Sequence, residues 1–331
     1  MDNNKLKKTL IDVGRDILIA FTIVVIVMLV LWAYCGIWPP MVVVESGSMQ
    51  HSEDRSFVGV IDTGDMVFVK TVDSKDDVVT YVDGEATNYA HYGAFGDVVI
   101  YRPNGDEGRV PIIHRAVIWL ELNDSAVSDD FNGIDYANYT FDIPSLGKYN
   151  TTDNIVLENY GHEEEWVNIS LRSLITYYDL MNKEPHGGFI TMGDNNAPYY
   201  DQPLNGSYEP VLPEWIVGKA VGEIPWFGLI KLKVTGTDLT EAPRNSWTNL
   251  FVTLFLILLI PFLFDYFAPK VSKKMEERKK SKSSTEKSEI PKEGAAPEDK
   301  HDDGSEAGIS DASPAENTPL GQTDNRQNKS E

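Results

Sequence analysis

Two long apolar runs without a charged residue constrain this chain more than any other feature of its sequence. The first, Ile17–Trp38, has 22 residues, which as a helix would rise about 33 Å and match the hydrocarbon core of a bilayer. It is longer than the apolar core of a cleaved signal peptide. The second, Ser246–Phe264, has 19 residues. We predict transmembrane helices over 17–38 and 246–267; for each run, a buried core helix is the alternative.

Basic residues flank the two runs on their outer sides. Four precede the first run, and six follow the second between residues 270 and 280. Lys and Arg concentrate on the cytoplasmic side of membrane proteins. We therefore expect a multi-pass protein of the cell membrane, with 1–16 and 268–331 in the cytoplasm and 39–245 outside. The tail 268–331 has few apolar residues after its start, so we expect it to be disordered.

The segment 39–245 is strongly acidic. It holds 33 Asp and Glu against 13 Lys and Arg, a net charge of −20 within a chain total of −22. Such a surface argues against nucleic acid as a partner, because phosphate binding needs a basic face. The segment keeps many Val, Ile, Tyr and Trp residues and can bury a core. High salt would relieve its self-repulsion, so we favour a saline environment over an acidic protein from an ordinary one.

Short β-branched stretches predict a mainly β domain between the two helices. They are bounded by Gly, Pro or Asp and cover 64–72, 96–103, 110–120, 187–194 and 215–225. The polar stretch of about 119–186 reads as a large surface insertion, with a short helix near 171–181. Asn-x-Ser/Thr tripeptides at five positions are consistent with external glycosylation: Asn123, Asn138, Asn150, Asn168 and Asn205.

The candidate nucleophile is Ser48, in the small-residue turn that follows the first apolar run. Its neighbours Ser46 and Gly47 would let backbone N–H groups approach a developing oxyanion. The single cysteine, Cys35, excludes a disulfide within the chain. The six histidines show no metal-ligand spacing, so we expect neither a metal nor another cofactor.

A serine needs a base to take its proton, and His114 is the best candidate. It lies in a stretch that predicts a strand, "VPIIHRAV", and its ordinary pKa suits base chemistry near neutrality. An acid must orient the imidazole, and "TMGDNNAPYYDQ" supplies Asp194 and Asp201. The alternatives are a packed core histidine and a plain turn at "GDNN".

Four motifs in this order resemble those of type I signal peptidases, in the archaeal and endoplasmic-reticulum branch that uses histidine. They are "SGSM" (46–49), "IIHRA" (112–116), "GDNN" (193–196) with a following Asp, and "VGKAVGEIPWFGLI" (217–230). The resemblance covers about 17–118 and 187–232 but not the insertion or the tail. The acidic composition, the insertion and the second apolar run resemble haloarchaeal members.

The resemblance implies Ser48 as nucleophile and His114 as general base. It implies two aspartates about six residues apart, which correspond to Asp194 and, at a spacing of seven, Asp201. We expect Asp201 to orient the histidine and Asp194 to have a structural or electrostatic role. Where relatives carry an acidic residue and Pro, this chain has Gln50 and His51, which we expect to affect the substrate rim.

The activity implied is removal of signal peptides from secretory preproteins after small residues at −1 and −3. We expect the substrate to add as a strand beside 41–49 or 64–72. Expected partners are preproteins, membrane lipids and, as a further candidate, the translocation machinery. The alternative is a non-catalytic, membrane-anchored, glycosylated surface protein or accessory subunit.

Overall fold

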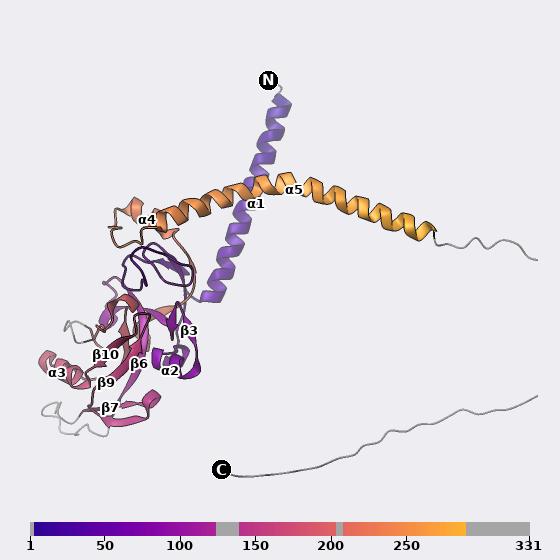
Figure 1. Cartoon of the computed structure of the whole chain (residues 1–331). Coiled ribbons are helices and arrows are strands. Elements are labelled where there is room, and N and C mark those ends of the chain that lie inside the picture. Colours follow the sequence, from indigo (N-terminus) through magenta and orange to yellow (C-terminus); the bar gives the residue numbers. More distant parts are fainter. Residues whose placement is uncertain (1–2, 124–138, 203–207, 289–331) are drawn as a thin grey trace, which may run out of the picture. The chain divides into compact units, whose positions relative to one another are not determined.

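The computed structural model describes residues 3–123, 139–202 and 208–288 (Figure 1). Two of the sequons, Asn138 and Asn205, lie outside these residues, as does the part of the expected tail after residue 288. The chain divides into two compact units, 1–264 and 265–331. All strands belong to the first unit.

The elements follow one another as short strands between two long helices. The strands are β1 Met41–Val43, β2 Met66–Lys70, β3 Ala90–His91, β4 Ala94–Phe95, β5 Val98–Tyr101, β6 Ile112–Asn123, β7 Thr140–Ile143, β8 Lys148–Thr151, β9 Ile155–Tyr160, β10 Glu165–Ile169, β11 Gly188–Met192 and β12 Ile216–Ile224. The α-helices are α1 Asn3–Cys35, α2 Tyr81–Thr87, α3 Leu171–Met181, α4 Gly228–Thr235 and α5 Ser246–Ser288. Single 3-10 turns cover Lys75–Asp77, Pro103–Gly105, Pro144–Leu146, Asp194–Asn196 and Pro213–Trp215.

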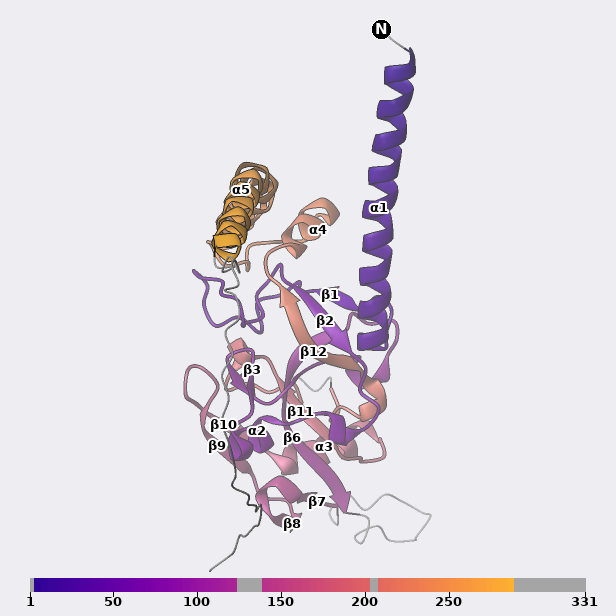
Figure 2. The same ribbon diagram turned by 90° about the vertical axis from the view of Figure 1, so that its right-hand side faces the viewer.

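An antiparallel sheet of eight strands forms the domain, which confirms the mainly β prediction. Its order is β1-β2-β12-β5-β6-β7-β8, and β11 also pairs with β6. Figure 2 shows β12 beside β2 in this sheet. The five stretches predicted as strands correspond to β2, β5, β6, β11 and β12, although β6 continues three residues past the predicted end at 120. β5 is buried at all four positions, as expected for the run of Val, Ile and Tyr in a strand covered on both faces.

The segment expected to be a surface insertion contributes to the main core instead. β7 and β8 extend the large sheet, while β9 and β10 form a separate pair. Phe141, Ile155 and Tyr160 are fully buried in the same apolar cluster as Ile118 of β6 and Ile190 of β11. Apolar residues at alternate positions of these strands bury one face, a pattern that the polar average of the segment conceals.

Helix α3 coincides with the short helix predicted at 171–181. Its N-cap is Ser170, whose hydroxyl accepts a hydrogen bond from the Ser173 backbone N–H. Its C-cap is Asn182, which has a left-handed conformation with φ of 49°. Its buried residues, Leu171, Leu174, Tyr177 and Tyr178, share one face at helical spacing.

Two helices, α1 and α5, are long and apolar enough to cross a membrane. The qualifying parts are Ile11–Cys35 and Ser246–Met275. α1 ends three residues earlier than predicted, before Gly36 with φ of +74°. α5 continues to Ser288, so residues 268–288 are helical and not disordered as expected. This stretch is rich in Lys and also holds Glu and Arg, residues that favour helix once a preceding helix has nucleated it.

Candidate active site

Ser48 lies in a turn after β1 that contacts fix on two sides. The neighbouring Met49 is 1% exposed and packs in an apolar cluster with residues of β2, β5 and β12. On the other side, the Asn195 backbone N–H donates to the Ser48 carbonyl at 2.9 Å, and the Asn195 side-chain amide donates to the Gly47 carbonyl at 3.0 Å. These contacts hold the half-buried Ser48 hydroxyl in a defined place.

His114, at the third position of β6, points its two ring nitrogens at Ser48 and Asp201. The distance from Nε2 to Ser48 Oγ is 3.0 Å, and that from Nδ1 to Asp201 Oδ2 is 2.7 Å. An ionised carboxylate can only accept, so Nδ1 carries the proton and Nε2 of the neutral ring accepts from the serine hydroxyl. The imidazole is 9% exposed and belongs to a strand paired on both sides, so its orientation is fixed.

Asp201 is positioned by the end of β11 and by a tyrosine of β5. Its backbone N–H donates to the Thr191 carbonyl at 2.9 Å. Its Oδ2 accepts from the hydroxyls of Thr191 at 2.6 Å and Tyr101 at 2.8 Å, besides His114. Burial, together with the adjacent Asp201 charge, raises the pKa of Tyr101 well above its usual value, so this phenol stays a neutral donor. The acid that orients the histidine is therefore held by a buried set of donors.

Asp194 does not contact His114 but forms a buried ion pair with Arg115. Arg115 Nε lies 2.7 Å from Oδ1, and Nη2 lies 2.6 Å from Oδ2. Burial alone would raise the pKa of Asp194, but the Arg115 charge and its hydrogen bonds outweigh burial and lower the pKa to about 2. The distinction predicted between the two aspartates thus appears in their contacts: Asp201 faces the imidazole and Asp194 faces the arginine.

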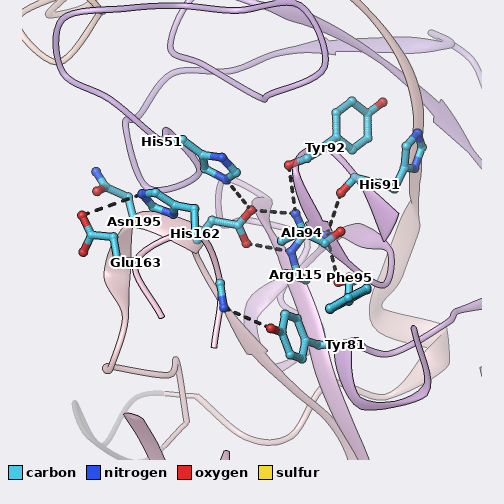
Figure 3. Close-up of polar contacts among 12 residues, drawn as sticks. His51, Tyr81, His91, Tyr92, Ala94, Phe95, Arg115, His162, Glu163 and Asn195 are labelled. Carbon is cyan, nitrogen blue, oxygen red and sulfur yellow. Dashed lines mark hydrogen bonds and ion pairs between the residues drawn. The ribbon is translucent and has the colours of Figure 1, made fainter. Parts of the chain in front are cut away.

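Arg115 joins this site to the β3–β4 hairpin. Its side chain is fully buried, and its Nη1 donates to the His91 carbonyl at 3.0 Å (Figure 3). The same atom donates to the Gly96 carbonyl at 2.9 Å. Its other Nη atom donates to the Tyr92 carbonyl at 3.3 Å. A single cation therefore ties the hairpin, β6 and the "GDNN" turn together.

His51 also contacts the Asp194 carboxylate and not Ser48. Its Nε2 lies 3.1 Å from Asp194 Oδ2. Its ring stacks on His162, from the β9–β10 turn, with centroids 4.2 Å apart and an angle of 8° between the rings (Figure 3). Burial and the neighbouring His51 lower the pKa of His162. The structure thus places His51 in the support of the site, in contact with the segment predicted as an insertion.

A cleft of about 520 Å³ opens beside Ser48. Three separate segments line it: the turn that carries the serine, with Glu53; the Asn195–Asn196 pair; and residues 240–242 with Arg244, which precede α5. The Glu241 carboxylate accepts a hydrogen bond of 2.7 Å from the Gly47 backbone N–H. Nothing in the sequence around Glu241 indicated this contact, because 194 residues separate the two partners.

The contacts of Tyr101 and Thr191 were likewise absent from the sequence-based prediction. The structure brings together three of the four predicted residues, Ser48, His114 and Asp201, and places Asp194 one contact away through Arg115. Within residues 3–123, 139–202 and 208–288, no group of three or more His, Cys, Asp or Glu side chains could hold a metal ion.

Comparisons with known proteins do not assign the chain to a family. No protein-family model matches the chain, and no curated protein matches it at a significant level.

The two aspartates should respond differently to removal of their charge. If the line from Ser48 through His114 to Asp201 catalyses hydrolysis, Asp201→Asn is expected to lower kcat by about 10³–10⁴-fold, because an amide favours the wrong imidazole tautomer while leaving the fold intact. Asp194→Asn should first lower the thermal midpoint, because Arg115 is left with an uncompensated buried charge. For each variant, kcat per folded molecule measures the effect on activity, and thermal unfolding of the same preparation measures the effect on stability. Full activity of Asp201→Asn would contradict the assignment.

Proposed function

We propose that this chain is a membrane-anchored serine endopeptidase of the type I signal peptidase kind. It would remove N-terminal signal peptides from secretory preproteins after small residues at −1 and −3. The observation that carries the proposal is the hydrogen-bonded line from Ser48 through His114 to Asp201. The positions in this line are those to which the motif resemblance assigns the nucleophile, base and acid. A non-catalytic surface protein or accessory subunit would have no need of such a line.

The proposed chemistry passes one proton through His114. Nε2 takes the proton of Ser48 as Oγ attacks the scissile carbonyl, and Asp201 stabilises the imidazolium that results. The Ser46 hydroxyl, 3.3 Å from Ser48 Oγ, is placed to donate to the oxyanion. The C–N bond then breaks and the imidazolium protonates the leaving amine. In the second half, water gives a proton to Nε2, attacks the ester and releases the acid, and Ser48 regains its proton.

The edge of β1 offers a place for the signal peptide. β1 is the first strand in the sheet order and, among the strands that the structure describes, pairs with β2 alone. β2, in the other expected docking stretch 64–72, is already paired with both β1 and β12, so we favour β1. An extended substrate would add to β1 by backbone hydrogen bonds and lead directly to Ser48, five residues beyond Val43.

Membrane anchoring would bring enzyme and substrate together. α1 ends at Cys35, and Ser48 follows thirteen residues later. If α1 and α5 span the cell membrane with both termini in the cytoplasm, the nucleophile lies near the outer surface. There, a signal peptide still inserted in the bilayer presents its cleavage site. Preproteins and lipids are the partners that this arrangement requires.

Incubation with a preprotein tests the function directly. The full-length protein in detergent, at high salt, should convert a preprotein with a small-x-small site into the mature chain. Mass spectrometry of the new N-terminus gives the cut position. An intact preprotein, or a cut elsewhere, would contradict the proposal.

A further inference from the structure

The cleft beside Ser48 and the free edge of β1 are different surfaces that meet at the nucleophile. The cleft is lined from residues 46–53, 195–196 and 240–244, and no residue of β1 contributes to it. If the proposed function holds, the signal peptide lies along β1 up to the scissile carbonyl. The chain on the other side of the scissile bond then has to leave along another surface, and this cleft adjoins Ser48.

The wall that precedes α5 is fixed against the loop that follows Ser48. The Arg244 backbone N–H donates to the Glu53 carbonyl at 3.2 Å. The Asn245 side-chain oxygen accepts from the Ser56 backbone N–H at 2.7 Å. Pro243, between Glu241 and these contacts, is buried. The segment from 240 to 245, which lines the cleft with residues 240–242 and Arg244, is therefore held in place and is not a loose connection between α4 and α5.

The charge on the lining is negative. Glu53 and Glu241 contribute two carboxylates. The one cationic side chain of the described lining, Arg244, lies 3.2 Å from Asp54, which offsets its charge. The hydrogen bond from the Gly47 N–H holds the Glu241 carboxylate against the residue next to the nucleophile. A carboxylate held beside the nucleophile acts more strongly on a charged side chain that follows the scissile bond than a mobile surface charge does.

We infer that this cleft binds the first residues of the mature chain and that Glu241 makes the enzyme select against acidic side chains there. Like charge next to Glu241 raises the free energy of the bound acidic substrate, whereas a basic side chain is attracted. This inference rests on the proposed function and adds a selectivity for the leaving side of the scissile bond.

Three preproteins that differ only at the first mature residue test it. With Lys, Gln and Glu at this position, kcat/KM of the wild-type enzyme should fall in that order, with Lys over Glu by roughly three- to fivefold. In Glu241→Gln, which keeps an acceptor for the Gly47 N–H, the ratio should approach one, and in Glu241→Lys it should invert. Measurements run at the lowest salt that preserves activity, because screening at high salt shrinks the ratio. Glu214→Gln, an exposed carboxylate between β11 and β12, is the matched control and should leave the ratio unchanged.

Equal rates for the three preproteins in the wild type would overturn the inference alone. A Glu241→Gln variant that cuts all three preproteins faster by the same factor would also overturn the inference, because Glu241 would then hinder binding without selecting among side chains. Failure of the wild type to cut any of the three would overturn the proposed function, and the inference with it.

Discussion

Replacement of Ser48 by alanine is expected to abolish preprotein cleavage, whereas Ser46→Ala is expected to leave a measurable rate. Loss of a serine nucleophile costs about 10⁶-fold in kcat in comparable hydrolases. Loss of one oxyanion donor costs no more than about 10³-fold. The two serines are two residues apart, but only the Ser48 hydroxyl contacts His114 Nε2. Single-turnover cleavage of one preprotein by both variants separates the two roles.

His114→Ala supplies the control for this comparison. It should be as inactive as Ser48→Ala, and the double variant should be no worse than either, because the two side chains act as a unit. Circular dichroism and membrane extraction should show wild-type folding and membrane insertion for Ser48→Ala, His114→Ala and the double variant. Activity of Ser48→Ala above that of Ser46→Ala would assign the nucleophile to Ser46. Full activity of His114→Ala would remove the general base from the mechanism.

Replacement of Arg115 by methionine is expected to cause the largest loss of stability. The change leaves Asp194 buried without its cation and leaves hairpin carbonyls, including those of His91 and Gly96, without their donor. Removal of one member of a buried ion pair costs about 3–5 kcal/mol, which lowers the midpoint by roughly 10 °C in a domain of this size. Thermal unfolding in detergent, followed by tryptophan fluorescence, measures the shift.

A matched arginine shows that burial causes the effect. Arg244 also pairs with an aspartate, Asp54, but both side chains are exposed, at 82% and 65%. Arg244→Met should therefore move the midpoint by no more than about 2 °C. If Arg115→Met does not fold, rapid digestion of the domain by added protease under native conditions reports the same loss. An unchanged midpoint in Arg115→Met would show that the ion pair contributes nothing net.

The strands of this fold could be read from the sequence because β-branched residues concentrate where both faces are buried. The stretch around β6 and the short β5 are examples: each has a run of Val and Ile with few polar interruptions. Helix α3 could be predicted because four apolar residues fall on one face. The helix in the tail could not be predicted, because the polarity of that stretch hides its helix propensity. The buried strands of the supposed insertion could not be predicted either, because the average polarity of the segment hides the alternation of apolar residues.

The candidate site, like the fold, has a part that the sequence predicted and a part that it did not. Ser48, His114 and two candidate aspartates stand in short motifs, so residue types and order were enough to select them. The motif resemblance favoured Asp201 as the partner of the histidine. The contact itself depends on how β11 pairs with β6, with a register shift between Ile190 and Thr191 that the sequence does not reveal. The hydroxyls of Tyr101 and Thr191 contact Asp201 for the same reason. Long-range contacts of this kind follow from strand order, which a single sequence leaves open.

If the proposed function holds, the position of residues 240–245 has a practical consequence for soluble versions of this protein. Anchored enzymes are commonly trimmed to their water-soluble part, and the last strand, β12, ends at Ile224. A chain cut soon after α4 would lack Glu241 and also the Asn245 contact that holds the loop at Ser56. The kinetics of such a shortened protein would report on a cleft that lacks one of its walls and the Glu241 charge. The part of the chain that would carry the proposed activity extends to Asn245, directly before α5 begins at Ser246.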